Sequence, residues 1–260
     1  MADRHEASFV SSTVLTTDRC VSGDVKGQEW YQADDVAEAY EDKRFSRGGR
    51  LIDRREKEAV LDALGPLEGR NVLEIACGTG RFTVMLAERD ADVIGLDISG
   101  PMLQQGREKA VRSGVRDQIE FMRGDAGRLP FPDDHFDAVF AMRFFHLADR
   151  PQEFLTEMAR VASEFVFFDT FNAGSARSVY NWALPMGSRL YEDPEVRALI
   201  RDSGLDLTGE AHDFIIPYGL YRKMPDWMAG SLRSFDRTAV GNRLGKRFAS
   251  VSYWTAEIPE

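Results

Sequence analysis

Cysteine is scarce in this chain of 260 residues, which has only Cys20 and Cys77. Two cysteines argue against a disulfide framework and against a cysteine-rich metal centre. The sequence also lacks any cluster of His, Cys and Asp at metal-ligand spacing, and it lacks the Gly-x-Ser-x-Gly elbow of α/β-hydrolases. These absences argue against a disulfide scaffold, a metal site and a serine nucleophile of that type.

Long apolar runs and an excess of positive charge are missing as well. No apolar run approaches the roughly 20 residues that cross a bilayer, and residues 1–6 are polar, unlike the core of a signal peptide. The formal net charge is −10 at pH 7 and the pI is near 5.0. An acidic surface repels phosphate backbones. We therefore expect a cytoplasmic protein without nucleic-acid partners or stable membrane insertion; the oligomeric state stays open.

The most informative stretch is residues 72–89, where a strand pattern passes through glycines into a helix pattern. Val72, Leu73 and Ile75 form an apolar run that is typical of a buried parallel strand. Residues 81–89 then carry apolar side chains at helical spacing. In an open α/β sheet, ligands bind where such a strand ends and its helix begins.

The spacing of the glycines narrows the class of ligand. Small residues at Ala76, Gly78 and Gly80 let a ligand approach the backbone closely. A dinucleotide fingerprint needs a third glycine, but Thr83 stands at that position. No Lys-Ser/Thr pair follows the glycines, which excludes a P-loop. An NAD-dependent oxidoreductase is therefore only a minor alternative.

Acidic residues lie at or near the ends of three successive predicted strands. Glu74 belongs to the first strand, Asp97 ends residues 92–97, and Asp125 follows residues 119–123. The carboxylate of Glu74 can orient an ammonium, and Asp97 can accept hydrogen bonds from two adjacent ribose hydroxyls. Two plainer interpretations stay open, since Asp97 could cap a helix and Asp125 could be a turn aspartate.

Four motifs occur in the order and spacing of one known family. They are Glu74-x-Ala76-Cys77-Gly78-Thr79-Gly80, Asp97-x-Ser99-x-x-Met102-Leu103, Gly124-Asp125-Ala126 and His146-Leu147-Ala148-Asp149. Together they resemble the class I S-adenosylmethionine (SAM)-dependent methyltransferases, and most closely the small-molecule subgroup that includes ubiquinone and menaquinone methyltransferases. The departure is Ala76, where the family usually has glycine, and we expect this change to be mild.

The resemblance implies SAM as the cofactor. It puts Ile98 and Met102 on the faces of the adenine. It also implies that Asp125 and the backbone N–H of Ala126 contact the edge of the adenine ring. The implied cofactor residues are Glu74, Ala76, Gly78, Thr79, Gly80, Asp97, Ile98, Met102, Asp125, Ala126 and Met142. A non-catalytic SAM-binding regulatory module is an alternative, although the intact acids and glycines argue against a degenerate pocket.

The resemblance also implies methyl transfer to a small-molecule acceptor by in-line displacement. Arg143 and Phe144 directly follow the strand at residues 136–142, so they are candidates for the substrate pocket. Tyr180 and Trp182 lie in the looser stretch 171–193, where aromatic side chains favour a flat or apolar substrate. A plain helical excursion is the alternative for that stretch.

Three residues are candidates for a general base. Histidine titrates near neutrality, which suits His146, but a histidine also occurs here in the family as a feature of the fold. Tyr40 either closes over the cofactor as part of an N-terminal lid or packs its helix down. Asp169 is the third candidate. The basic stretch at 222–247 either recognises an anionic substrate group or is a solvated helix face.

Residues 71–170 alternate strands and helices, which predicts a doubly wound, mostly parallel sheet of the α/β class. Two further strands at 210–217 and 247–257 would complete a seven-stranded, Rossmann-like sheet. We expect a flexible arm at 1–28 and a single methyltransferase domain at 29–260. Its expected parts are N-terminal lid helices at 29–64, a SAM-binding core at 70–170, a substrate-side insertion at 171–193, and a C-terminal helix and strand pair at 194–260.

Overall fold

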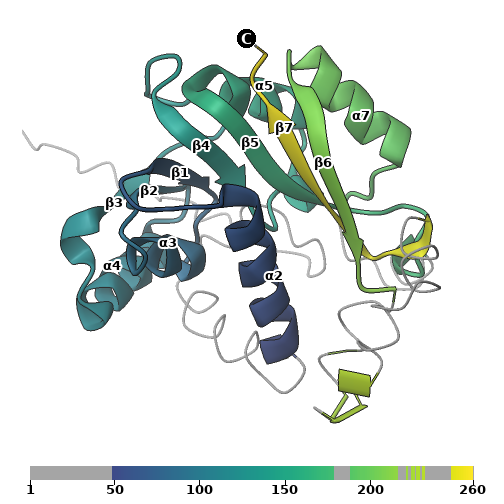
Figure 1. Ribbon diagram of the computed structural model, residues 1–260, viewed down its shortest axis with the longest axis horizontal. Coiled ribbons are helices and arrows are strands. Elements are labelled where there is room, and N and C mark those ends of the chain that lie inside the picture. The colour runs from purple at the N-terminus through teal and green to yellow at the C-terminus, as the bar shows by residue number, and fades with distance from the viewer. Residues whose placement is uncertain are drawn as a thin grey trace, which may run out of the picture.

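A seven-stranded sheet runs through the molecule (Figure 1). The computed structural model describes residues 49–178, 188–215 and 247–259, with a few positions between 221 and 231. The strands are β1 (Asn71–Ile75), β2 (Asp92–Asp97), β3 (Ile119–Arg123), β4 (Phe136–Ala141), β5 (Ala162–Phe171), β6 (Asp206–Asp213) and β7 (Val251–Glu257). Their order in the sheet is β3-β2-β1-β4-β5-β7-β6.

Strands β1 to β5 are parallel, and β7 runs antiparallel between β5 and β6. The predicted doubly wound, mostly parallel seven-stranded sheet is therefore confirmed. The direction of winding changes between β1 and β4, which is the place where open α/β sheets bind ligands. Strand β6 begins at Asp206, earlier than predicted, and it ends where Phe214 turns to a positive φ of 58°.

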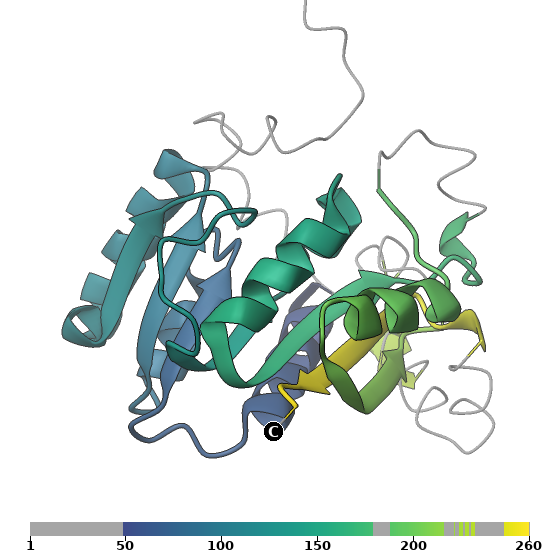
Figure 2. The same cartoon turned by 90° about the horizontal axis from the view of Figure 1, so that it is seen from above.

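Helices cover both faces of the sheet (Figures 1 and 2). The described helices are α2 (Gly49–Leu64), α3 (Arg81–Ala87), α4 (Gly100–Ser113), α5 (Pro151–Val161) and α7 (Asp193–Asp202). Two clusters of buried hydrophobic side chains lie on the two faces of the sheet. Helices α2, α3 and α4 pack on one face, and α5 and α7 pack on the other. Successive side chains of a strand point to opposite faces, so Val72 joins the first cluster and Leu73 the second.

Local sequence signals account for the ends of α4, the helix that follows β2. Ser99 is its N-cap and accepts a hydrogen bond from the backbone N–H of Met102, and Pro101 lies in the first turn. Gly114 closes the helix in the left-handed conformation, with φ 75°. Within the described ranges, no helix is both long and apolar enough to cross a membrane.

Candidate active site

The turn after β1 contains two glycines, Gly78 and Gly80, that have different surroundings. Both adopt positive φ, 56° at Gly78 and 69° at Gly80. A Cβ built on Gly80 would lie 2.8 Å from the ring of Phe121, whereas a Cβ on Gly78 would meet nothing within 4 Å. Gly80 is thus required for packing against β3, while the space in front of Gly78 is open to a ligand.

Ala76 occupies the place of the family's first glycine. Its φ is 54°, in the left-handed region where residues with a Cβ are strained. The departure from glycine therefore costs more than the small size of alanine suggested, about 1–2 kcal/mol of backbone energy. The turn keeps this conformation because its neighbours fix it, including a hydrogen bond from the Cys77 N–H to the Leu96 carbonyl at 3.1 Å.

Glu74 lies beneath the turn and is 2% exposed. It accepts a hydrogen bond from the Thr83 hydroxyl at 2.5 Å and another from the Thr83 backbone. Burial raises the pKa of Glu74 to about 8, against the opposing effects of Thr83 and of the nearby Arg81 charge. A cation arriving at this carboxylate would favour its ionised form.

Asp97 joins the end of β2 to the glycine turn. Its Oδ2 accepts from the Gly78 N–H and its Oδ1 from the Ser99 N–H, both at 2.8 Å. Burial raises the pKa of Asp97, and these backbone donors oppose the rise. Two carboxylate oxygens offer about four acceptor sites, so Asp97 keeps capacity for ligand hydroxyls beside its backbone bonds.

Ile98 and Met102, which both follow Asp97 in the chain, differ sharply in exposure. Ile98 is 38% exposed, one of the few large apolar side chains in the described ranges that face solvent, whereas Met102 is buried. Asp125 is exposed and accepts from the Gly127 N–H at 2.9 Å in a turn, while Ala126 is buried beside it. The plainer interpretation of Asp125 as a turn aspartate therefore describes its contacts, and its open position leaves it accessible to a ligand.

The chain leaves β4 through a strained residue. Arg143 has a φ of 62°, and its backbone N–H donates to Asp169 Oδ1 on β5 at 2.5 Å. Met142 before it is buried. Phe144 after it is also buried and packs on Phe154 of α5, with ring centroids 5.1 Å apart. Arg143 thus lies at the carboxyl edge of the sheet, whereas Phe144 belongs to the core.

His146 and two arginines surround the end of β5. The His146 ring lies 4.7 Å from the ring of Phe171, and its side chain is buried. The guanidinium carbons of Arg143 and Arg177 lie 4.7 Å and 3.5 Å from the same ring. Tyr40, Tyr180 and Trp182, also predicted for the site, fall outside the described residues.

Sequence reasoning missed Glu56, a buried acid of α2. Its carboxylate pairs with Arg81, the residue after Gly80, at 2.7 Å, and with Arg143 at 3.5 Å. A signal was present, because Glu56 is in phase with the buried Ile52 and Val60 on the apolar face of the helix. An acid in such a position requires a partner.

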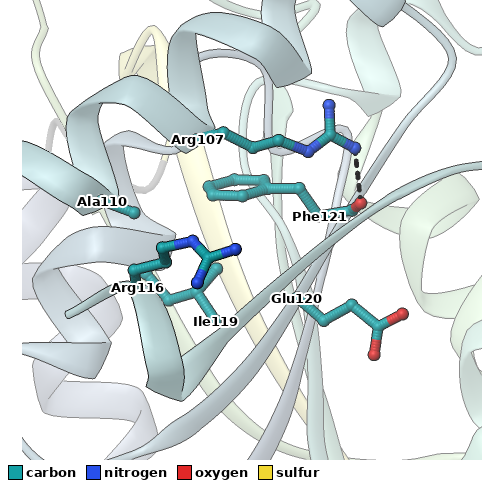
Figure 3. A pocket seen from close by; sticks show the side chains of 6 residues that line it. All are labelled: Arg107, Ala110, Arg116, Ile119, Glu120 and Phe121. Carbon is teal, nitrogen blue, oxygen red and sulfur yellow. Dashed lines mark hydrogen bonds between the residues drawn. The ribbon is translucent and has the colours of Figure 1, made fainter.

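A separate pocket of about 320 Å³ lies on the outer side of β3 and α4. It is lined by Arg107, Ala110, Arg116, Ile119, Glu120 and Phe121 (Figure 3). Ile119 begins β3, and Arg123, at the other end of the strand, is the neighbour of Asp97 in the register of the sheet. The pocket thus lies toward the amino end of β3, although Phe121 in its lining also packs against Gly80 of the turn. The described residues contain no group of three or more His, Cys, Asp and Glu side chains able to hold a metal.

Comparison with known proteins agrees with this geometry. A family described as "Methyltransferase domain" matches residues 72–164. The ubiquinone/menaquinone biosynthesis C-methyltransferase UbiE of Brucella canis is 31% identical over 210 residues, 76% of this chain and 74% of that protein. The demethylmenaquinone methyltransferase of Renibacterium salmoninarum is 39% identical over 108 residues, 42% of this chain and 43% of that protein.

Solved structures show the same fold. The Trm112 activator–methyltransferase complex of Haloferax volcanii contains a similar chain, with a TM-score of 0.63, 22% identity, and coverage of 87% of this chain and 97% of the other. The [4+2]-cyclase SpnF also has a TM-score of 0.63, with 19% identity over 83% and 84% of the two chains. Because a cyclase shares the fold, the fold alone does not assign an activity.

The chain belongs to the class I SAM-dependent methyltransferase family. Within it, the relatives are of the quinone-methyltransferase type. This confirms the family and the cofactor that the four motifs predicted. The matches to the Renibacterium protein and to its Beutenbergia and Roseobacter counterparts span less than half the length of those proteins.

Proposed function

We propose that the protein transfers a methyl group from SAM to a small-molecule acceptor. The observation that carries the proposal is the hydrogen bond from the Gly78 N–H to Asp97. It joins the acid at the end of β2 to the open turn after β1, at the switch point of the sheet. An acid and an accessible backbone thus lie side by side where a nucleoside with vicinal hydroxyls can bind.

The chain's residues fit the parts of SAM. Glu74 would hold the ammonium, since a buried carboxylate gains from a cationic partner. Asp97 would hold the ribose hydroxyls, and the exposed Ile98 with Met102 would cover the adenine, whose edge would meet Asp125 and Ala126. The remaining cofactor candidates, Ala76, Gly78, Thr79, Gly80 and Met142, lie along the turn and at the end of β4.

The glycine turn also suits a ligand without phosphates. SAM carries none, so the turn need not hold an anion, and Thr83 at the third-glycine position is used to bind Glu74. Bound SAM supplies a methyl carbon already activated by a sulfonium. What the protein must add is alignment of the acceptor and exclusion of water, and orientation can contribute roughly 7–11 kcal/mol.

A quinol is the acceptor class that we propose. The support is the activity of the relatives, which are quinone C-methyltransferases and demethylmenaquinone methyltransferases. Arg143 lies at the edge beside the cofactor turn and is a proposed substrate contact, together with Tyr180 and Trp182, whereas Phe144, also predicted for this pocket, packs in the core against Phe154. Tyr40 is a proposed base, and His146 is a second candidate whose contact with the Phe171 ring favours a packing role. We also propose an N-terminal lid and a substrate-side insertion at 171–193. The proposed location is cytoplasmic.

The test is methyl transfer from SAM with a labelled methyl group to four acceptors: a naphthoquinol, a benzoquinol, a phenol and an amine. We expect label in a quinol product, and loss of transfer in Asp97→Asn. Transfer to the amine alone would overturn the acceptor class. SAM binding without transfer to any acceptor would favour the alternative, a non-catalytic SAM-binding module.

A further inference from the structure

Glu56 of α2 connects the two sides of the candidate site. The residue is fully buried, with an exposed fraction of 0%. Its Oε2 contacts Arg81 Nη2 at 2.7 Å, and its Oε1 contacts Arg143 Nη1 at 3.5 Å. One carboxylate therefore ties together two arginines that come from different segments of the chain.

The two arginines come from the two segments that border the proposed site. Arg81 directly follows Gly80 in the cofactor turn, and Arg143 directly follows Met142 at the end of β4. Their guanidinium groups are largely buried, with side-chain exposures of 9% and 16%. A buried arginine that loses its carboxylate partner is left with uncompensated charge. Arg81 also pairs with Asp53, so we expect the loss of Glu56 to act mainly on Arg143.

Two further contacts hold Arg143, whose backbone is strained. Its backbone N–H donates to Asp169 and its guanidinium lies 4.7 Å from the ring of Phe171, while its φ is 62°. Strained backbone persists only where surrounding contacts determine it, and such residues cluster at functional sites. Glu56 contacts Arg143 at the guanidinium, whereas Asp169 holds the Arg143 backbone, so we expect Glu56 to affect the position of that cation more than the path of the backbone.

We propose that Glu56 is a positioning residue that fixes the Arg143 guanidinium at the acceptor side of the site, at a set distance from the cofactor turn. The inference rests on the proposed function, because Arg143 is a proposed substrate contact. Glu56 acts through Arg143 and does not touch the reacting atoms. Its loss is expected to weaken use of the acceptor while leaving the cofactor in place.

Asp53 offers a matched control on the same helix. It pairs with the other terminal nitrogen of Arg81, Nη1, at 2.5 Å, and with Lys57 at 3.2 Å. Asp53→Asn therefore removes one Arg81 contact and keeps the pair between Glu56 and Arg143. In Glu56→Gln, the glutamine is nearly the same size as the native glutamate but lacks the negative charge that both arginines contact.

The first readout is independent of any acceptor. In nuclear magnetic resonance spectra of the ligand-free protein, the Arg143 Nε–H signal, assigned by its loss in Arg143→Lys, reports the order of the guanidinium. We expect Glu56→Gln to broaden or shift that signal and Asp53→Asn to leave it unchanged. An unchanged signal in folded Glu56→Gln would overturn the proposal, even if the wild type binds SAM.

The second readout separates the acceptor from the cofactor. With naphthoquinol, Glu56→Gln should raise the KM at least about tenfold, the usual scale of a lost charge-assisted hydrogen bond. The dissociation constant of SAM should change less than about threefold because Asp53 still holds Arg81. The double variant Glu56→Gln/Arg143→Ala should be no worse than Arg143→Ala alone.

Equal effects of Glu56→Gln and Asp53→Asn on the naphthoquinol KM, or additive effects in the double variant, would overturn the proposal. If Glu56→Gln does not fold, Glu56→Asp replaces it, since it keeps the charge and shortens the side chain. The same KM-selective change is then expected. Failure of the proposed function is distinguishable, because it appears as a wild type that binds no SAM or methylates no acceptor, whereas the Arg143 Nε–H signal tests Glu56 in the ligand-free protein.

Discussion

Thr83 donates its hydroxyl to the buried carboxylate of Glu74, one turn into the helix that follows the glycines. A dinucleotide-binding turn has glycine at the position of Thr83. Here the threonine side chain is used to satisfy an acid that lies under the turn. Thr83 therefore argues against NAD binding, and it also supports the proposed contact between Glu74 and the ammonium group of SAM.

Glu74 predicts a pH dependence of stability in the ligand-free protein. Its folded pKa of about 8 exceeds the ordinary value of 4.5, so between these values the folded state binds a proton that the unfolded state has released. The free energy of unfolding should therefore fall as pH rises through this window, by at most about 1.4 kcal/mol per pH unit. Glu74→Gln should lose that slope, measured by denaturant unfolding. An unchanged fall in the variant would contradict the assignment.

Ala76→Gly should stabilise the protein. Glycine relieves about 1–2 kcal/mol of left-handed strain and costs about 0.5–1 kcal/mol of chain entropy, which leaves a gain of up to about 1.5 kcal/mol. The control is Ala87→Gly in α3, a helical position that should lose about 1 kcal/mol. Thermal unfolding compares the two variants, and equal losses in both would refute the strain at Ala76.

Alanine substitutions at the two glycines should separate packing from ligand access. Gly78→Ala should cost about 1–2 kcal/mol of stability from strain and also weaken SAM binding, because its Cβ enters open space at the turn. Gly80→Ala should cost about 1–3 kcal/mol more, because its Cβ meets Phe121 at 2.8 Å. Phe121→Leu should rescue part of the Gly80→Ala loss and none of the Gly78→Ala loss. Equal rescue of both would show that Gly78 is also a packing position.

His146→Gln tests the proposed base against a packing role. The ring is buried and lies 4.7 Å from the ring of Phe171, which favours packing. We expect the variant to lose stability while kcat keeps its pH profile. A loss in kcat of about 10²–10⁴-fold, with the neutral limb of the profile removed, would instead identify His146 as the base.

The sequence was sufficient where short-range patterns carry the information. The strand before Gly78, the acid ending β2 and the alternation of strands and helices each have a local signature, and the structure contains all three. The contacts of Glu56 could not be predicted in this way, because its partners lie 25 and 87 positions away. Its phase on the apolar face of α2 indicated a buried acid without naming what it binds.

The backbone at Ala76 and the packing of Phe144 were also beyond local reasoning. An alanine carries no sign of a left-handed conformation, which here follows from the tight exit of β1 toward Gly78. Phe144 follows a strand end, as Arg143 does, but its ring lies against Phe154 on α5. Which of two adjacent residues faces a ligand depends on the helix that covers the sheet.

Calorimetric titration of SAM into the wild type and Asp97→Asn, with NAD titrated in parallel, tests whether the turn after β1 and Asp97 form a SAM site. We expect SAM to bind the wild type and NAD not to bind it. Asp97→Asn should weaken the affinity for SAM by about tenfold or more, since a charge-assisted hydrogen bond to the ribose is lost. Binding of NAD in place of SAM, or equal SAM affinity in the two proteins, would contradict it.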